Sequence, residues 1–264
     1  MWYRRRVASP RAPAIYWADA ALSQIMRSNL DGSEVVSIPV PSRGPAGIAL
    51  DLAHGQIYWS DSFTHRIQRA ALDGTNVQEL VSTGLVAPAG IALGVASREL
   101  YWASGARRIE RANLDGSDVE MIASKNLVAP FGVALDFVTG KIYWSDDGRI
   151  GRANHDGSGA ETIRCPGLVA AAGIALDLRH CHIYWADNRS GKIQRASLDG
   201  GEPEDLVTGL KSPEGIALNL VGGAIYWTDP GSHKIQRADL DGQQVEDLVT
   251  ETGFPTGIAL DLGV

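Results

Sequence analysis

The sequence predicts an all-β protein, a single six-bladed β-propeller of four-stranded antiparallel blades. Three observations predict it. One aromatic pair returns six times at a nearly constant interval, a tight-turn signal returns with it, and no segment sustains a helical apolar period over three turns. Each copy holds four short apolar runs separated by turns, and four strands per copy of about 40–45 residues is the period of a propeller blade.

The aromatic pair is Tyr-Trp. Its copies begin at intervals of 42, 43, 42, 41 and 42 residues, at Tyr16, Tyr58, Tyr101, Tyr143, Tyr184 and Tyr226. These pairs hold six of the seven tryptophans and six of the seven tyrosines, and only Trp2 and Tyr3 lie outside them. A fixed period that concentrates the aromatic residues in this way indicates repeated structural units.

Two further signals divide each copy into strands. An Asp-Gly step, which favours a tight turn because glycine accepts positive φ, recurs at Asp31, Asp73, Asp115, Asp156, Asp199 and Asp241. A Gly-Ile/Val-Ala-Leu run recurs at Gly47, Gly90, Gly132, Gly173, Gly215 and Gly257. Large and small residues alternate along this run, so we expect it to form a strand whose two faces pack against neighbouring blades.

The two ends of the chain predict how the ring closes. The chain begins with a Tyr-Trp strand and ends with a Gly-Ile-Ala-Leu strand over residues 257–262. We therefore expect a composite last blade, a clasp with its inner strand from the C-terminus and its outer three from residues 15 to about 38. Such a clasp removes a free sheet edge. Residues 1–14 are then an N-terminal tail, and residues 15–264 are one propeller domain.

Composition limits the partners and the compartment. The chain has 24 Lys+Arg against 31 Asp+Glu, a net charge of −7, which argues against a general nucleic-acid binder. Its two cysteines, Cys165 and Cys181, exclude a disulfide scaffold. No apolar run is long enough for a membrane span or a secretory signal, so we expect a cytoplasmic protein if the chain is complete.

The motifs resemble a known repeat. Tyr226-Trp227-Thr228-Asp229 resembles the signature of the YWTD repeat, the low-density lipoprotein receptor class B repeat, and the other copies read Tyr-Trp-Ala-Asp or Tyr-Trp-Ser-Asp, except at Ser104. The resemblance covers about residues 15–262. It implies a six-bladed propeller with the Tyr-Trp strand second from the channel, and a surface that binds protein ligands as in the receptors.

The chain also departs from that family pattern. It lacks the cysteine-rich modules that flank receptor propellers, Gly94 replaces an aspartate, Ala171 replaces a proline, and the hairpin at 146–149 is short. Lipoprotein uptake therefore does not carry over to this chain.

Two sets of aspartates recur and have two interpretations each. The signature set is Asp19, Asp61, Asp146, Asp187 and Asp229. We expect it to tie strand ends to neighbouring backbone, with ligand or metal binding as the alternative. The set that ends inner strands is Asp51, Asp136, Asp177 and Asp261. These residues either cap the following turn or form a carboxylate ring for Ca²⁺; we expect no cofactor, with calcium as the alternative.

One face is the predicted binding face. It carries the hairpins between the second and third strands, which end in a basic rim, and the loops that enter the inner strands. The rim residues are Arg66, Arg108, Arg149, Lys192 and Lys234. The mouth of the channel is expected to hold Ala46, Ala89, Phe131, Ala172, Glu214 and Thr256, with Phe131 as an aromatic hot spot or a plug.

The sequence favours a non-catalytic protein-interaction module. Its partner would be a protein or peptide, an acidic one if the basic rim takes part, and neither nucleic acid nor a membrane span is expected. The alternative is a metal-dependent hydrolase that resembles the lactonases on six-bladed propellers. That alternative requires Glu, Asp or Asn side chains at the channel, where the inner strands offer mostly Gly and Ala. No catalytic residue is predicted.

Overall fold

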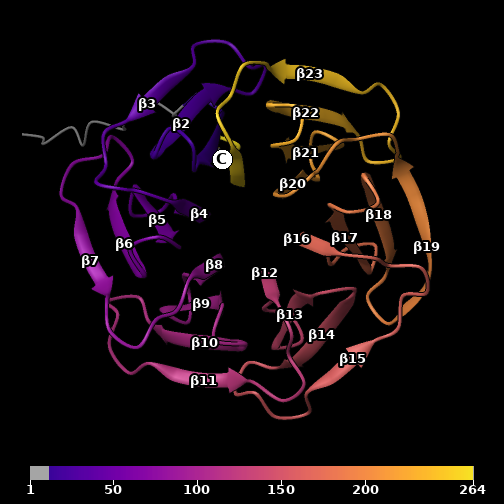
Figure 1. Ribbon diagram of the computed structural model, residues 1–264, viewed down its shortest axis with the longest axis horizontal. Coiled ribbons are helices and arrows are strands. Elements are labelled where there is room, and N and C mark those ends of the chain that lie inside the picture. The colour runs from indigo at the N-terminus through magenta and orange to yellow at the C-terminus, as the bar shows by residue number, and fades with distance from the viewer. Residues whose placement is uncertain (1–11, 264) are drawn as a thin grey trace, which may run out of the picture.

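The computed structural model describes residues 12–263, and these form six four-stranded antiparallel sheets arranged around a central channel (Figure 1). This confirms the predicted six-bladed propeller. Within residues 12–263, no helix is long and apolar enough to cross a membrane.

The strands fall into four concentric layers, and the Tyr-Trp pair lies in the second. The inner strands are β4 (Pro45–Asp51), β8 (Pro88–Gly94), β12 (Pro130–Asp136), β16 (Ala171–Asp177), β20 (Ile216–Asn219) and β24 (Pro255–Asp261). The second strands are β1 (Ala14–Asp19), β5 (Gln56–Asp61), β9 (Glu99–Ser104), β13 (Lys141–Asp146), β17 (His182–Asp187) and β21 (Ala224–Asp229). The third strands are β2 (Gln24–Asn29), β6 (Arg66–Ala71), β10 (Arg108–Asn113), β14 (Arg149–Asn154), β18 (Lys192–Ser197) and β22 (Lys234–Asp239). The outer strands are β3 (Val36–Ile38), β7 (Gln78–Val81), β11 (Glu120–Ala123), β15 (Glu161–Ile163), β19 (Gly200–Val207) and β23 (Glu246–Val249).

We number the blades in chain order. Blade I is β4–β7, blade II is β8–β11, blade III is β12–β15, blade IV is β16–β19, blade V is β20–β23, and blade VI is β24 with β1–β3. Blade VI is the predicted clasp, because β1 pairs antiparallel with β24 and places Ala14 opposite Asp261. Residues 1–11 of the predicted tail lie outside the described residues, and β1 already begins at Ala14.

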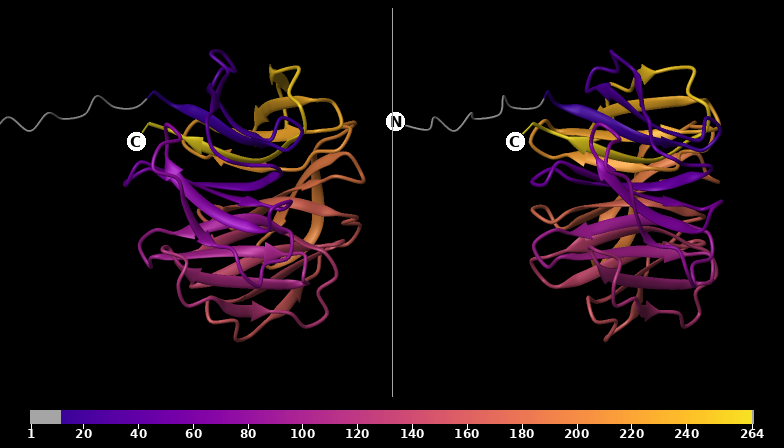
Figure 2. Two further views of the ribbon diagram at one scale, coloured as in Figure 1. Left: turned by 60° about the vertical axis from the view of Figure 1, so that its left-hand side comes forward. Right: turned by 90° about the vertical axis from the view of Figure 1, so that its left-hand side faces the viewer.

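The disc has two faces, which Figure 2 shows from the side. The mouth face carries the hairpins between second and third strands and the loops that enter the inner strands. The opposite turn face carries the hairpins between inner and second strands and the Asp-Gly turns. The two loop sets of the predicted binding face therefore lie together on the mouth face.

The core consists of six clusters, one at each junction between blades. Each cluster combines the tyrosine of one blade with the tryptophan of the next, as Tyr58 of blade I and Trp102 of blade II do. Burial of one tryptophan removes roughly 150–250 Å² from water. The repeated aromatic pair therefore holds neighbouring blades together.

Candidate functional site

Glycines line the channel at the mouth face, and they allow the inner strands to approach one another closely there. Its cavity of about 140 Å³ is bounded by the glycine of each inner strand and by the Ile or Val that follows it. A Cβ atom added to Gly132 would lie 2.6 Å from the carbonyl oxygen of Ala172 in the next blade, and the other five inner-strand glycines have equivalent contacts. Only glycine allows the inner strands to approach so closely.

The residue before each glycine lies at or next to the mouth-face end of its inner strand. Phe131 is half-buried and lines the cavity together with Ala46. Thr256 was expected to form part of the binding surface, but its side chain is buried. It is only 5% exposed, and its hydroxyl donates to the backbone carbonyls of Pro45 at 3.1 Å and Ala46 at 3.0 Å. Thr256 therefore joins blades VI and I and offers a ligand little surface.

Glu214 is the one acid at the mouth. Its main chain is fixed, because the Glu214 amide donates to the Thr228 carbonyl at 2.9 Å and its carbonyl accepts from the Gly173 amide at 2.7 Å. Burial of the side chain raises the pKa of Glu214 to about 7. Because no ion pair in residues 12–263 involves Glu214, its carboxyl is a titratable group held at the mouth without a compensating charge.

The signature aspartates lie buried at the ends of the second strands. Each accepts hydrogen bonds from backbone amides of the loop that enters the inner strand, as Asp187 does from Val169 at 2.8 Å and Ala170 at 3.2 Å. The same pattern holds at Asp19, Asp61, Asp146 and Asp229. This arrangement occupies the carboxylates within the fold and shapes the mouth-face loops.

The basic rim lies on the mouth face, but each of its cations already has an acidic partner. The pairs are Arg66–Glu79 at 2.7 Å, Arg108–Glu110 at 3.6 Å, Arg149–Asp146 at 3.1 Å, Lys192–Asp205 at 2.7 Å and Lys234–Asp247 at 2.6 Å. In each of the five pairs, both residues belong to the same blade. The rim is therefore largely neutralised, because every rim cation has an acid of its own blade within 4 Å.

Sequence reasoning missed the exposed valines on the mouth face. Val86, Val128 and Val169 stand two residues before the inner strands of blades II, III and IV and are 45%, 45% and 48% exposed. We call these three residues together with Phe131 the apolar arc. At the equivalent loop position, blades V, VI and I carry Lys211, Gly253 and Arg43. The three valines stand in a Leu-Val-Ala triplet that recurs in three consecutive copies, and this repeat is the sequence signal that could have identified them.

The inner-strand aspartates lie on the turn face and bind their own turns. Asp51 accepts from the amide and ring of His54, Asp136 from the amides of Val138 and Thr139, and Asp177 from the amide and ring of His180. Asp261 accepts from the amide of Gly263 at 3.0 Å. Among residues 12–263 no group of three or more His, Cys, Asp or Glu side chains is arranged to hold a metal ion.

Comparison with known proteins agrees with this architecture. The family model described as low-density lipoprotein receptor repeat class B matches residues 55–93, 98–137 and 223–262. No curated protein matches the chain.

Among solved structures, the chain is similar to one in a crystal structure of a nidogen/laminin complex, with a TM-score of 0.84 and 22% identity over 95% of this chain and 99% of that one. It is also similar to virginiamycin B lyase from Staphylococcus aureus, with a TM-score of 0.63 and 20% identity over 81% and 73% of the two chains. A catalytically inactive variant of that lyase, with quinupristin, gives a TM-score of 0.69 and 16% identity over 96% and 93%. Similarities at this level of identity show a shared fold.

Proposed function

We propose that this chain, a propeller of the low-density lipoprotein receptor class B (YWTD) repeat family, is a non-catalytic module that holds a protein partner on its mouth face. The similar structure of a nidogen/laminin complex contains two proteins in contact, which makes a protein partner the first class to test. Because fold alone does not determine function, the proposal rests on the residues of the mouth face.

The observation that carries the proposal is the exposed apolar surface of this face. The apolar arc occupies three adjacent blades, and on the same face Phe63 of blade I and Leu22 and Phe254 of blade VI are also exposed. Exposed apolar residues that gather on one part of a surface mark interaction sites more often than scattered ones do. Phe131 stands beside the channel in the middle blade of the three and can serve as the aromatic anchor of an interface.

The chemistry of the arc favours a partner with an apolar anchor. Exposed ion pairs contribute little to affinity, and the rim cations are already paired with acids of their own blades. An acidic partner would have to compete with those acids for the cations. A protein segment that places an apolar side chain over Phe131 meets no such competition.

Blade III provides a matched test of the face. Phe131 lies near the mouth-face end of β12, and Phe137, 50% exposed, directly follows the turn-face end of the same strand. Wild type, Phe131→Glu and Phe137→Glu would be immobilised and exposed to extract from the source cells, and the captured proteins identified by mass spectrometry. The expected result is a partner that wild type and Phe137→Glu retain and Phe131→Glu loses. Loss through Phe137→Glu alone would move the binding site to the turn face.

An enzyme is the second candidate, and Glu214 is the observation that favours it. A carboxyl with a pKa of about 7 in a channel mouth has the proton affinity of a general acid or base near neutral pH. Lactone substrates and quinupristin would be incubated with wild type and Glu214→Gln. Turnover by wild type that Glu214→Gln abolishes, with both proteins equally folded, would establish this candidate.

A further inference from the structure

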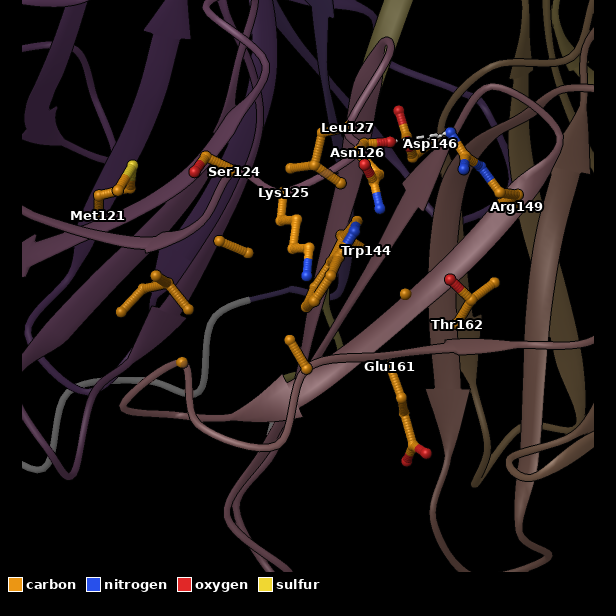
Figure 3. A pocket seen from close by; sticks show the side chains of 15 residues that line it. Met121, Ser124, Lys125, Asn126, Leu127, Trp144, Asp146, Arg149, Glu161 and Thr162 are labelled. Carbon is orange, nitrogen blue, oxygen red and sulfur yellow. Dashed lines mark hydrogen bonds and ion pairs between the residues drawn. The ribbon is translucent and has the colours of Figure 1, made fainter.

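A second cavity lies away from the mouth of the channel, in the groove between blades II and III (Figure 3). It measures about 490 Å³ and lies within the size range of small-molecule pockets. One wall is β11 with the loop that follows it, and the other is the edge of β13–β15. Trp144 lies at the centre of Figure 3 between these two walls.

Two departures from the repeat open this cavity. On the third strand, blade III has Gly151 opposite its tryptophan. The other five blades have a Met, Gln or Glu at this position, namely Met26, Gln68, Glu110, Gln194 and Gln236. The hairpin of blade III is also the shortest, with two residues between Asp146 and Arg149. Both changes remove side-chain volume from the same edge of the same blade.

The missing side chain also leaves a donor without its usual acceptor. Trp102, Trp185 and Trp227 donate their indole N–H at 3.0 Å to Glu110, Gln194 and Gln236 on the neighbouring strand. Gly151 has no side chain to accept. Trp17, Trp59 and Trp144 all lack an acceptor for the indole N–H within residues 12–263, and the N–H groups of Trp17 and Trp59 are fully buried. Trp144 differs from Trp17 and Trp59 because it lines the cavity, where a ligand or water can accept from its N–H.

The charges that line the cavity leave one cation uncompensated. Asp146 is paired with Arg149 at 3.1 Å, and Glu161 is paired with Arg152 at 2.8 Å. Glu161 points away from Trp144 in Figure 3. Lys125 forms no ion pair with any residue from 12 to 263, and it lines the cavity together with Met121, an exposed apolar side chain.

We propose that this cavity binds a small organic carboxylate with an apolar body. Lys125 and the Trp144 N–H supply donors for the carboxylate, while the hydroxyls of Ser124 and Thr162 line the same hollow. Met121 and Leu127 supply apolar surface for the body of the ligand. This site lies outside the apolar arc, so the proposal goes beyond the proposed function and does not depend on it.

The test uses N-acetyl-L-phenylalanine as the carboxylate probe and N-acetyl-L-phenylalaninamide as its neutral match. Isothermal titration calorimetry with the full chain should give saturable binding of the acid and none of the amide. Lys125→Gln should weaken acid binding about tenfold, because a charge-assisted hydrogen bond is lost. Gly151→Gln introduces the side chain that blades I, IV and V carry at this position, and its Cβ would lie 2.2 Å from Cε2 of Trp144. This variant should abolish binding, because the indole must shift into the cavity.

Lys211→Gln is the matched control, since it removes a cation from the equivalent loop of blade V. It should leave probe affinity unchanged. The carboxylate could belong to a small molecule or to the C-terminus of a peptide. A tetrapeptide with a free C-terminal phenylalanine distinguishes the two, because tighter binding of the tetrapeptide than of N-acetyl-L-phenylalanine would identify a peptide C-terminus as the ligand. Equal binding of acid and amide, or unchanged binding in both Lys125→Gln and the folded Gly151→Gln variant, would overturn the proposal.

Discussion

At the scale of single residues, distance rather than backbone conformation selects glycine around the channel. Gly132 does not have the positive φ that turn glycines such as Gly116 and Gly157 adopt. What excludes a side chain is the carbonyl of the next blade, because a Cβ atom there would meet backbone that cannot move independently. Gly151 is the opposite case, since its neighbour is the side chain of Trp144, which borders a cavity.

This difference predicts unequal effects of the same substitution within blade III. Gly132→Ala should lower the free energy of unfolding by about 1–3 kcal/mol, the usual effect of overpacking a rigid site. Gly151→Ala should cost less, because the indole of Trp144 can shift toward the cavity. Urea unfolding of the two variants beside wild type measures both values, and an equal loss would show that side-chain freedom at Trp144 does not matter.

Glu214 predicts a pH dependence of stability. Its pKa is raised from 4.5 to about 7, so the folded state holds a proton that the unfolded state has released between these values. Stability contributed at this position is therefore highest below pH 4.5, falls as the pH rises toward 7, and stays low above it. Relative to Glu214→Gln, wild type should lose up to about 3 kcal/mol over that interval. Urea unfolding at pH 4.5, 6 and 8 measures the difference, and parallel curves for the two proteins would contradict the shift.

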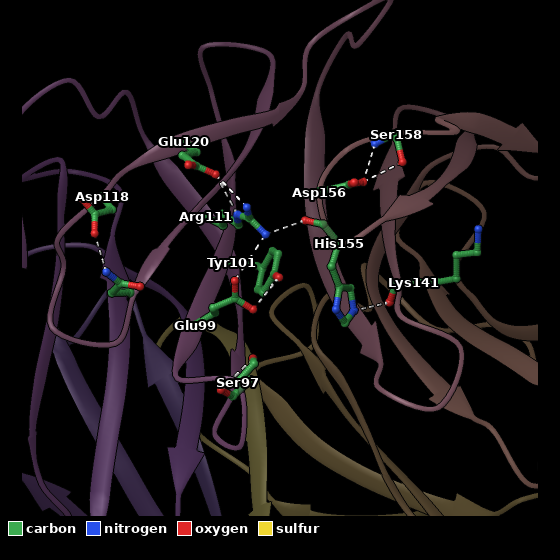
Figure 4. A network of polar contacts seen from close by, with 12 residues as sticks. Ser97, Glu99, Tyr101, Arg111, Asp118, Glu120, Lys141, His155, Asp156 and Ser158 are labelled. Carbon is green, nitrogen blue, oxygen red and sulfur yellow. Dashed lines mark hydrogen bonds and ion pairs between the residues drawn. The ribbon is translucent and has the colours of Figure 1, made fainter.

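At the scale of the elements, side chains that cross between blades join the repeated strands. Figure 4 shows the outer edge of this system, where Arg111 of blade II donates to Glu120 at 2.8 Å and to the carbonyl of His155 in blade III at 3.1 Å. The corresponding arginines Arg69, Arg152 and Arg195 also reach a carbonyl of the next blade. Removing the guanidinium N–H from water costs free energy, and the hydrogen bond offsets this cost only while the carbonyl of the next blade stays in place.

The strand-end aspartates predict a stability effect that depends on the blade. Asp187→Ala should lower the free energy of unfolding by about 2–3 kcal/mol, because it leaves the amides of Val169 and Ala170 without an acceptor. Ser104→Ala in blade II should cost less, since the Ser104 hydroxyl makes longer bonds, 3.2 Å to Val86 and 3.3 Å from Ala106. Thermal unfolding of both variants tests the order, and a larger loss at Ser104 would reverse this interpretation of the two sites.

The sequence predicted the strands and blades more completely than it predicted the candidate sites. The Tyr-Trp interval and the Asp-Gly steps report local strand and turn chemistry, so they predicted four-stranded blades and the composite sixth one. The pairing of Lys192 with Asp205 depends on which strands lie side by side, and a repeat pattern does not specify side-chain partners across them. The cavity beside Gly151 is harder still to foresee, because it arises from an absent side chain in one blade.

At the scale of the whole molecule, the two ends of the chain close the ring through backbone pairing. Ala14 faces Asp261 and Tyr16 faces Ala259 in the ladder between β1 and β24. Asp19 adds bonds from the amides of Gly253 and Phe254 at 2.8 Å each. Elsewhere, neighbouring blades meet through side chains, a connecting loop and isolated backbone bonds such as that from the Gly173 amide to the Glu214 carbonyl. Within residues 12–263, blade VI is the one sheet in which strands far apart in the sequence pair.

The clasp predicts what a rearranged chain should do. In one variant residues 252–261 would precede residues 14–251, joined by the turn sequence of residues 52–55, which connects the matching strands of blade I. All strands of blade VI are then continuous. The new seam to blade V is held by the core cluster of Trp17 and Tyr226 and by isolated hydrogen bonds, such as that from the Thr228 hydroxyl to the Thr256 carbonyl at 2.6 Å. This variant should fold but melt roughly 5 °C or more below wild type, because opening the seam no longer requires breaking a β-ladder. A second variant ending at residue 251 lacks β24 and should lose the cooperative transition by circular dichroism. If the rearranged chain melts as wild type does, side-chain packing between blades alone is enough to close the ring.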